Sequence, residues 1–152
     1  MLYEIIANKV LVVCACAWAV AQLLKVVVTL VREKRFDLRY LVASGGMPSS
    51  HSAAVGALVV SVAMIEGLGS VAFSIAVVLA LIVMYDSAGV RQSVGQQSIV
   101  LNRIIQELRF RRPIAELERD LRELLGHTPF QVIAGAALGA LIAWLWLDIP
   151  NW

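Results

Sequence analysis

Four long apolar runs limit what this chain can fold into more than any other feature of its sequence. They cover residues 10–31, 53–65, 71–85 and 130–147. A helix that crosses a bilayer needs about 20 apolar residues, so the first and last runs are close to that length, whereas the middle two need their flanks. A short connector with two glycines joins the middle two runs into a helical hairpin. The pattern predicts an all-α polytopic membrane bundle with about four spanning helices.

The composition agrees with this prediction. Hydrophobic residues make up 60% of the 152 residues, against about 45–50% in a soluble domain. We therefore expect one integral membrane domain over 1–152, with spans at roughly 5–31, 50–66, 70–88 and 129–147. The net charge of +2 gives no reason to expect a nucleic-acid partner. Cys14 and Cys16 lie two residues apart in an apolar run and are interpreted as packing residues.

The first apolar run has an alternative interpretation as a signal peptide. Ala19-Val-Ala21 resembles a small-residue cleavage site. Glu4 accompanies Lys9 in the first nine residues, however, and the apolar residues resume after Lys25. We favour a retained membrane helix.

The polar region 92–126 lies between the third and fourth runs. Its leucines and isoleucines recur at helical spacing among Arg and Glu, and Pro113 divides them into two stretches. This pattern predicts two amphipathic helices that lie on the membrane or on the protein's own inner face. A small soluble helical hairpin would show the same pattern.

The basic residues indicate which side of the membrane each loop occupies. Twelve of the thirteen Lys and Arg residues lie in 25–50 or 91–127, and the remaining one is Lys9. Because cytoplasmic loops carry the excess of Lys and Arg, both regions are predicted to be cytoplasmic and both termini outside. The prediction is an integral protein of the cytoplasmic (inner) membrane.

Residues that could bind and process an anion collect on the same predicted face. Lys25 and Arg32 are seven residues apart, about two helical turns. His51 opens the second run, where a helix N-terminus favours an anion. Arg91 follows the third run, and His127 precedes the fourth. This set suits a phosphate group at the level of the lipid headgroups.

These residues resemble a known signature in their order. Lys25-x6-Arg32, Pro48-Ser-Ser-His51, Arg91 and the His127-Thr-Pro-Phe-Gln segment are similar to the motifs of the type 2 phosphatidic acid phosphatase superfamily. That superfamily includes lipid phosphatases and vanadium-dependent haloperoxidases. The phrases SGGMPSSHSA, MYDSAGVRQ and LLGHTPFQVIAGAALG resemble its short, divergent membrane branch.

The resemblance implies a mechanism and a role for each matching residue. His127 would attack phosphorus to form a phosphohistidine, and His51 would protonate the leaving alkoxide. The phosphoryl oxygens would be held by Lys25, Arg32 and Arg91, with Ser49 and Ser50 completing the anion cradle. The scheme needs no metal and no other cofactor.

Several positions depart from the superfamily pattern. Glu33, Ser50 and Val90 replace a proline, a glycine and a serine. Thirty-five residues, 92–126, separate Arg91 from His127 where the wider superfamily has five. Gln131 stands where an acidic residue orients the nucleophile.

Gln131 has a structural interpretation of its own. Thr128-Pro-Phe-Gln131 fits a capping box, with the proline at the first helical position. The orienting acid would then come from elsewhere, and Asp86 is the candidate, because a carboxylate at the end of an apolar run is costly without a partner. Asp86 could equally form an ion pair with Arg91, or hold a divalent metal.

Two functions from different classes fit this sequence. The first is a lipid phosphate phosphatase that hydrolyses a phosphomonoester at the cytoplasmic face, with phosphatidylglycerophosphate and phosphatidic acid as candidate substrates. The second is a scaffold or carrier that binds lipid phosphate without chemistry, which the missing acid at Gln131 favours. Gly135-x3-Gly139 permits close helix packing within one chain or between two, so a homodimer is a candidate assembly.

Overall fold

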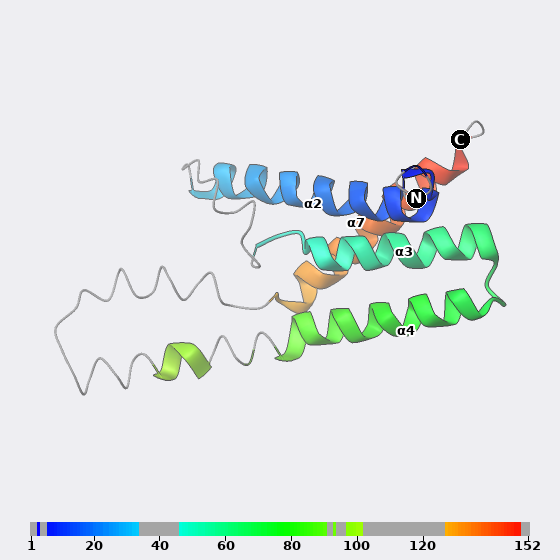
Figure 1. Cartoon of the computed structure of the whole chain (residues 1–152). Coiled ribbons are helices and arrows are strands. Elements are labelled where there is room, and N and C mark those ends of the chain that lie inside the picture. The colour runs from blue at the N-terminus through cyan, green and yellow to red at the C-terminus, as the bar shows by residue number, and fades with distance from the viewer. Residues whose placement is uncertain are drawn as a thin grey trace.

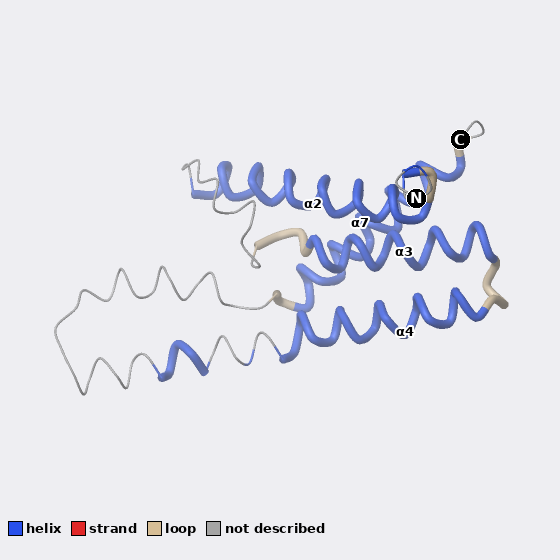
Figure 2. Tube along the Cα trace, in the orientation of Figure 1, coloured by secondary structure: helices blue, strands red, loops and turns tan. Residues whose placement is uncertain are grey.

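The computed structural model describes residues 3, 6–33, 46–90, 93, 97–101 and 127–149. Four long helices dominate them: α2 (Lys9–Glu33), α3 (Ser50–Glu66), α4 (Val71–Tyr85) and α7 (Pro129–Asp148). A π-helical turn, η2 (Asp86–Val90), continues α4. The described residues contain no strand (Figure 2), which confirms the predicted all-α class.

Three helical segments are long and apolar enough to cross a membrane. They are Lys9–Val31 with 23 residues, Val71–Gly89 with 19 and Pro129–Asp148 with 20. Helix α3 is apolar too but has only 17 residues, or about 26 Å at 1.5 Å per residue. The prediction of about four spanning helices is therefore confirmed for three of them, with α3 as a shorter apolar fourth.

Consecutive helices alternate in direction, and α3 occupies the centre (Figure 1). Helix α3 packs most extensively on α7 and also contacts α2 and α4. Its link to α4 is a tight turn in which Gly67 has a positive φ of 82° and Ser70 caps the next helix. The start of α3, the end of α4 and the start of α7 consequently meet at one end of the bundle (Figure 1).

Glycines allow α3 and α7 to approach each other closely. A Cβ at Gly139 would overlap the backbone of Ala53, and one at Gly135 would overlap the carbonyl oxygen of Ser49. Gly56 of α3 lies in the same way against the backbone of Ala136. Small residues at such positions let two helix backbones touch. The Gly135-x3-Gly139 pair therefore packs within this chain.

The side chains between the helices are small, and the large apolar ones face outwards. Val13, Ala17, Ala57 and Ala143 form a buried cluster. Large apolar residues on the outer surfaces of the helices are exposed in the isolated chain, as expected where lipid covers a spanning helix.

Part of the sequence prediction falls on residues that are not described. The amphipathic insert at 92–126 lies outside the described residues except for 93 and 97–101. Arg91 and the side chain of Arg32 also lie outside them. The roles predicted for both arginines stay predictions.

Candidate functional site

Helix α2 contributes a buried lysine to the end of the bundle where α3 and α7 begin. The Lys25 side chain is only 1% exposed. Its stem passes beside Gly46, where an added Cβ would lie 3.0 Å from Lys25 Cγ. Gly46 has a positive φ of 96°, a conformation that glycine adopts at no steric cost. A glycine at 46 thus leaves the space through which the lysine stem passes.

The segment before α3 is fixed by serine hydrogen bonds. Ser49 is the N-cap, and its Oγ accepts from the backbone N–H of Ser52 at 3.4 Å and from the Ser52 hydroxyl at 3.0 Å. The backbone N–H of Ser49 donates to the carbonyl of Gln131 at 3.2 Å. Ser49, Ser50 and Ser52 are all buried. The Met47–Pro48 peptide bond that precedes them is cis.

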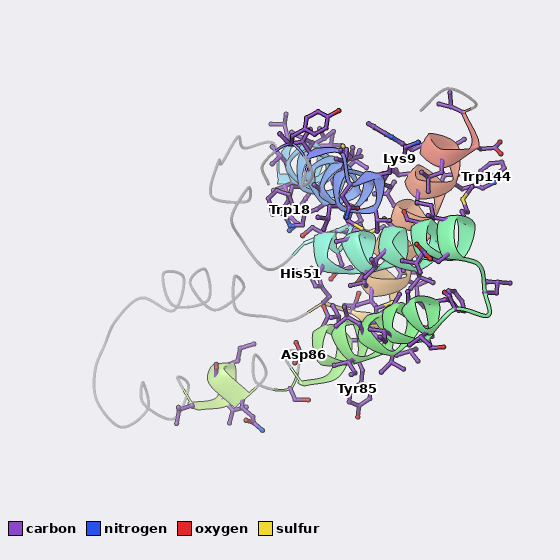
Figure 3. All side chains as sticks on the ribbon, turned by 45° about the vertical axis from the view of Figure 1, so that its right-hand side comes forward. Lys9, Trp18, His51, Tyr85, Asp86 and Trp144 are labelled. Atoms are coloured by element: carbon purple, nitrogen blue, oxygen red, sulfur yellow. The ribbon has the colours of Figure 1, made fainter. Side chains whose placement is uncertain are left out.

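The two histidines differ sharply in exposure. His51 lies in the first turn of α3 and is exposed, at the same end of the bundle as Asp86 (Figure 3). His127 lies directly before α7 and is only 2% exposed. Its backbone N–H donates to the carbonyl of Ser87 in η2 at 3.1 Å. The structure thus joins the end of α4 to the start of α7 beside the imidazole.

The first turn of α7 holds the His127 ring. Thr128 and Gln131 form a complete capping box, as predicted from the sequence. The Gln131 Oε1 accepts from the backbone N–H of Thr128 at 3.0 Å and also lies 3.3 Å from His127 Nδ1. The sequence predicted the cap and placed the group that orients His127 elsewhere, whereas in the structure the capping amide also contacts the imidazole.

The other nitrogen of the imidazole is buried and available. His127 Nε2 has no hydrogen-bond partner among the described residues. A buried nitrogen without a partner costs free energy in a resting fold. Such atoms are common where a ligand or substrate completes the site.

Burial and nearby positive charges disfavour the charged form of His127. Burial lowers the pKa of His127 below its usual value, and the positive charges of Lys25 and His51 lower it further. The contact with Gln131 and the backbone of Gly46 act in the opposite direction on this pKa. Lys25, His51 and His127 are therefore close enough to interact electrostatically, although they come from three different segments.

Asp86 lies one residue from the Ser87 carbonyl that binds His127. It is half-buried, and its backbone N–H donates to the carbonyls of Ile82 and Val83. Since Gln131 already contacts His127 Nδ1, the orienting role proposed for Asp86 would have to act at another atom. No group of three or more His, Cys, Asp or Glu side chains within the described ranges could hold a metal ion.

Sequence reasoning missed three residues of this site. Gly46 makes room for Lys25, Ser52 completes the hydrogen bonds around Ser49, and Ser87 binds the backbone of His127. Only Ser52 carries a readable signal, because it stands three residues after an N-cap serine. The other two depend on contacts between distant segments.

Comparisons with known proteins agree with this architecture. The model of a family described as the Divergent PAP2 family matches residues 6–142. A Bacillus subtilis (strain 168) protein, the uncharacterized membrane protein YuiD, is 36% identical over 148 residues, which cover 91% of this chain and 94% of that protein. No solved structure matches the chain.

Proposed function

The chain belongs to the Divergent PAP2 family, and from that premise we propose that it is a membrane-embedded phosphatase that hydrolyses a lipid phosphomonoester. The family match confirms the resemblance found in the motifs. One observation carries the proposal further: a buried histidine with an unpartnered Nε2, among the described residues, lies beside a buried lysine and a second histidine.

The place of the site in the bundle supports a lipid substrate. Lys25 lies on α2 and His127 directly precedes α7, two helices that are long and apolar enough to span a bilayer, and His51 lies on the shorter apolar helix α3 at the same end. The ends of spanning helices lie at the depth of the lipid headgroups. A phosphate on a lipid would reach this site without leaving the membrane, and phosphatidylglycerophosphate and phosphatidic acid are the proposed substrates.

In the proposed reaction, His127 Nε2 attacks phosphorus and the ester P–O bond breaks. The electrons of that bond pass to the leaving alkoxide, which takes a proton from His51. Water then attacks phosphorus while His51 takes its proton, and the N–P bond breaks with its electrons returning to His127 Nε2, which releases phosphate. A preorganised cation near the phosphoryl oxygens stabilises the transition state, and Lys25 supplies it from the described part of the chain. Arg32 and Arg91 are proposed to act with Lys25.

The membrane topology completes the proposal. Helix α3, extended by its polar flanks, would serve as a fourth span, so that the site faces the cytoplasm as the distribution of Lys and Arg predicts. A cysteine introduced at Ser93, which is exposed, should react with an impermeant maleimide only after the membrane is opened. Labelling in intact cells would place the site on the outer face.

The test of the proposed function is phosphate release by the purified protein in mixed micelles of detergent and lipid. We expect release from phosphatidylglycerophosphate or phosphatidic acid, and we expect His127→Asn to lower it at least about 10³-fold, or about 4 kcal/mol. Asp148→Asn is the matched control, since Asp148 is exposed at the far end of α7 and should leave the rate unchanged. An acid-labile, base-stable phosphoenzyme should accumulate in wild type alone.

A second candidate function is binding of lipid phosphate without turnover. It is favoured by Gln131, which gives His127 an amide neighbour in place of the superfamily's acid. Under this alternative, lipid phosphate would bind to wild type and to His127→Asn with equal affinity, and neither would release phosphate. Release that survives His127→Asn would contradict the nucleophile assignment itself.

A further inference from the structure

We propose that Gln131 is a positioning residue that holds His127 in the tautomer with the proton on Nδ1, so that Nε2 is the unprotonated nucleophilic nitrogen. The catalytic meaning of this assignment rests on the proposed phosphatase function. The assignment of the tautomer rests on the geometry at the start of α7 and on the burial and charges around His127, and it does not depend on that function.

The Gln131 atom that faces the ring can be identified from its hydrogen bonds. Oxygen and nitrogen of a side-chain amide are assigned from their hydrogen bonds. Here the backbone N–H of Thr128 points at this atom from 3.0 Å. A backbone N–H can only donate, so the atom is the carbonyl oxygen Oε1.

The hydrogen bond between Gln131 Oε1 and His127 can have only one direction. Oε1 has lone pairs and no hydrogen, so it can only accept. A hydrogen bond over the 3.3 Å between Nδ1 and Oε1 therefore needs a proton on Nδ1. In a neutral imidazole only one nitrogen carries a proton, which leaves the lone pair on Nε2.

The surroundings of His127 disfavour the doubly protonated ring. The groups that act on the charge of His127 are Lys25 from α2, His51 from α3, the Gly46 backbone and Gln131 itself. None of these described groups is a carboxylate, and η2 offers its Ser87 carbonyl to the backbone N–H, not to the ring. With two basic neighbours and almost no exposed surface, the imidazolium form is disfavoured.

The capping box makes this arrangement rigid. The Thr128 hydroxyl accepts from the backbone N–H of Gln131 at 3.4 Å, and Oε1 accepts from the backbone N–H of Thr128. The first turn of α7 thus fixes the position of Oε1 independently of the His127 ring. An amide at this position supplies the acceptor without a negative charge, so the ring is oriented and stays neutral.

The tautomer matches the electron flow of the proposed reaction. The Nε2 lone pair forms the N–P bond, while the Nδ1 proton stays in its hydrogen bond to Oε1. The ester P–O bond breaks, and its electrons leave with the alkoxide oxygen. No proton has to leave Nε2 first, so no additional base is required for the attack.

Nitrogen-15 NMR of the labelled protein in lipid nanodiscs tests the tautomer directly. The chain has only two histidines, so His51→Asn assigns both rings. We expect His127 to show a bare Nε2 and a protonated Nδ1. Gln131→Leu should shift the ring towards the Nε2–H form, which predominates in free imidazole side chains. A protonated Nε2 in wild type, or a tautomer unchanged in Gln131→Leu, would overturn the proposal.

Gln131→Glu supplies the second variant, because a glutamate keeps both acceptor contacts and suits the capping box. We expect the same tautomer, with the pKa of His127 raised by about 1–3 since an opposite charge now lies beside the ring. The acid limb of the pH–rate profile should move upwards by the same amount. A profile that stays in place while the NMR pKa moves would refute the positioning role.

Ser70→Ala is the matched control for loss of a helix cap. Ser70 Oγ caps α4 at the opposite end of the bundle by accepting from the backbone N–H of Phe73 at 3.1 Å. We expect this variant to lose stability while the His127 tautomer and the pH–rate profile stay as in wild type. If all variants keep the expected tautomers and none releases phosphate, the proposed function fails and the assignment of the ring stands.

Discussion

Replacing Gly139 by alanine should separate the two central helices. An added Cβ would overlap the carbonyl oxygen of Ala53 and would lie 2.6 Å and 2.8 Å from its C and Cα atoms. All three atoms belong to the α3 backbone, so no side chain can rotate away. For the two carbon contacts to reach an ordinary distance of about 3.5 Å, the helices must move apart by about 1 Å, and relief of the closer oxygen contact needs a larger movement.

The free-energy cost follows from two opposing effects. Overpacking of a close-packed contact costs about 1–3 kcal/mol. Alanine regains about 0.5–1 kcal/mol over glycine within a helix. Since the contact is with backbone, the overpacking cost lies at the upper end of its range, and we expect Gly139→Ala to lower the free energy of unfolding by about 2 kcal/mol. Because α3 carries His51 and the first turn of α7 contacts His127, the same displacement should also lower the proposed phosphatase activity.

Unfolding in mixed micelles with increasing SDS measures this cost, with the fluorescence of the four tryptophans, two of which (Trp144 and Trp146) lie on α7, as the signal. Ala137→Leu is the matched control, because Ala137 lies two residues before Gly139 on the exposed face of the same helix. The control should stay within about 0.5 kcal/mol of wild type. A Gly139→Ala protein as stable as wild type, or a control that is destabilised equally, would refute the close contact between α3 and α7.

Two further predictions concern the basic groups. Since burial lowers the pKa of His127, neutral His127 contributes fully to stability above the unfolded-state pKa of about 6.5, and this contribution is lost as the pH falls below that value towards the lowered folded-state pKa. The SDS concentration at the unfolding midpoint should therefore decrease as the pH is lowered from about 7 to about 5, and it should decrease less in His127→Asn. An equal dependence of the midpoint on pH in the two proteins would contradict the pKa shift. Lys25→Met keeps the packing beside Gly46 but removes the cation, so kcat/KM should fall by about 10²–10³-fold while stability is kept. An unchanged kcat/KM would show that Lys25 does not bind the phosphate in the proposed reaction.

The fold could be predicted because its main signal is local. Each apolar run is a property of consecutive residues, and the bilayer sets a length that such a run has to meet. The cap at Thr128 was also readable, because a capping box has a fixed spacing of three residues. Helix α3 has the bounds predicted from the sequence, but with 17 residues it is shorter than the helices that are long enough to span a membrane.

The contacts between distant segments could not be predicted in this way. Gly135 and Gly139 permit packing within a chain or between chains, and only the arrangement of α3 and α7 decides between them. Gly46 looks like one of two turn glycines until Lys25 is found beside it. Gln131 looked like a cap or a lost acid, because a spacing rule does not say where the amide oxygen of a side chain will lie.

One backbone hydrogen bond explains how the two histidines keep their relative position. The N–H of Ser49, which caps the helix of His51, donates to the carbonyl of Gln131, whose side chain contacts the ring of His127. Gly135 lets this bond form, since a Cβ there would overlap the Ser49 carbonyl. The small residues that bring α3 and α7 together therefore also set the geometry of the site. The contacts between α3 and α7 thus both pack the two helices and place the two histidines.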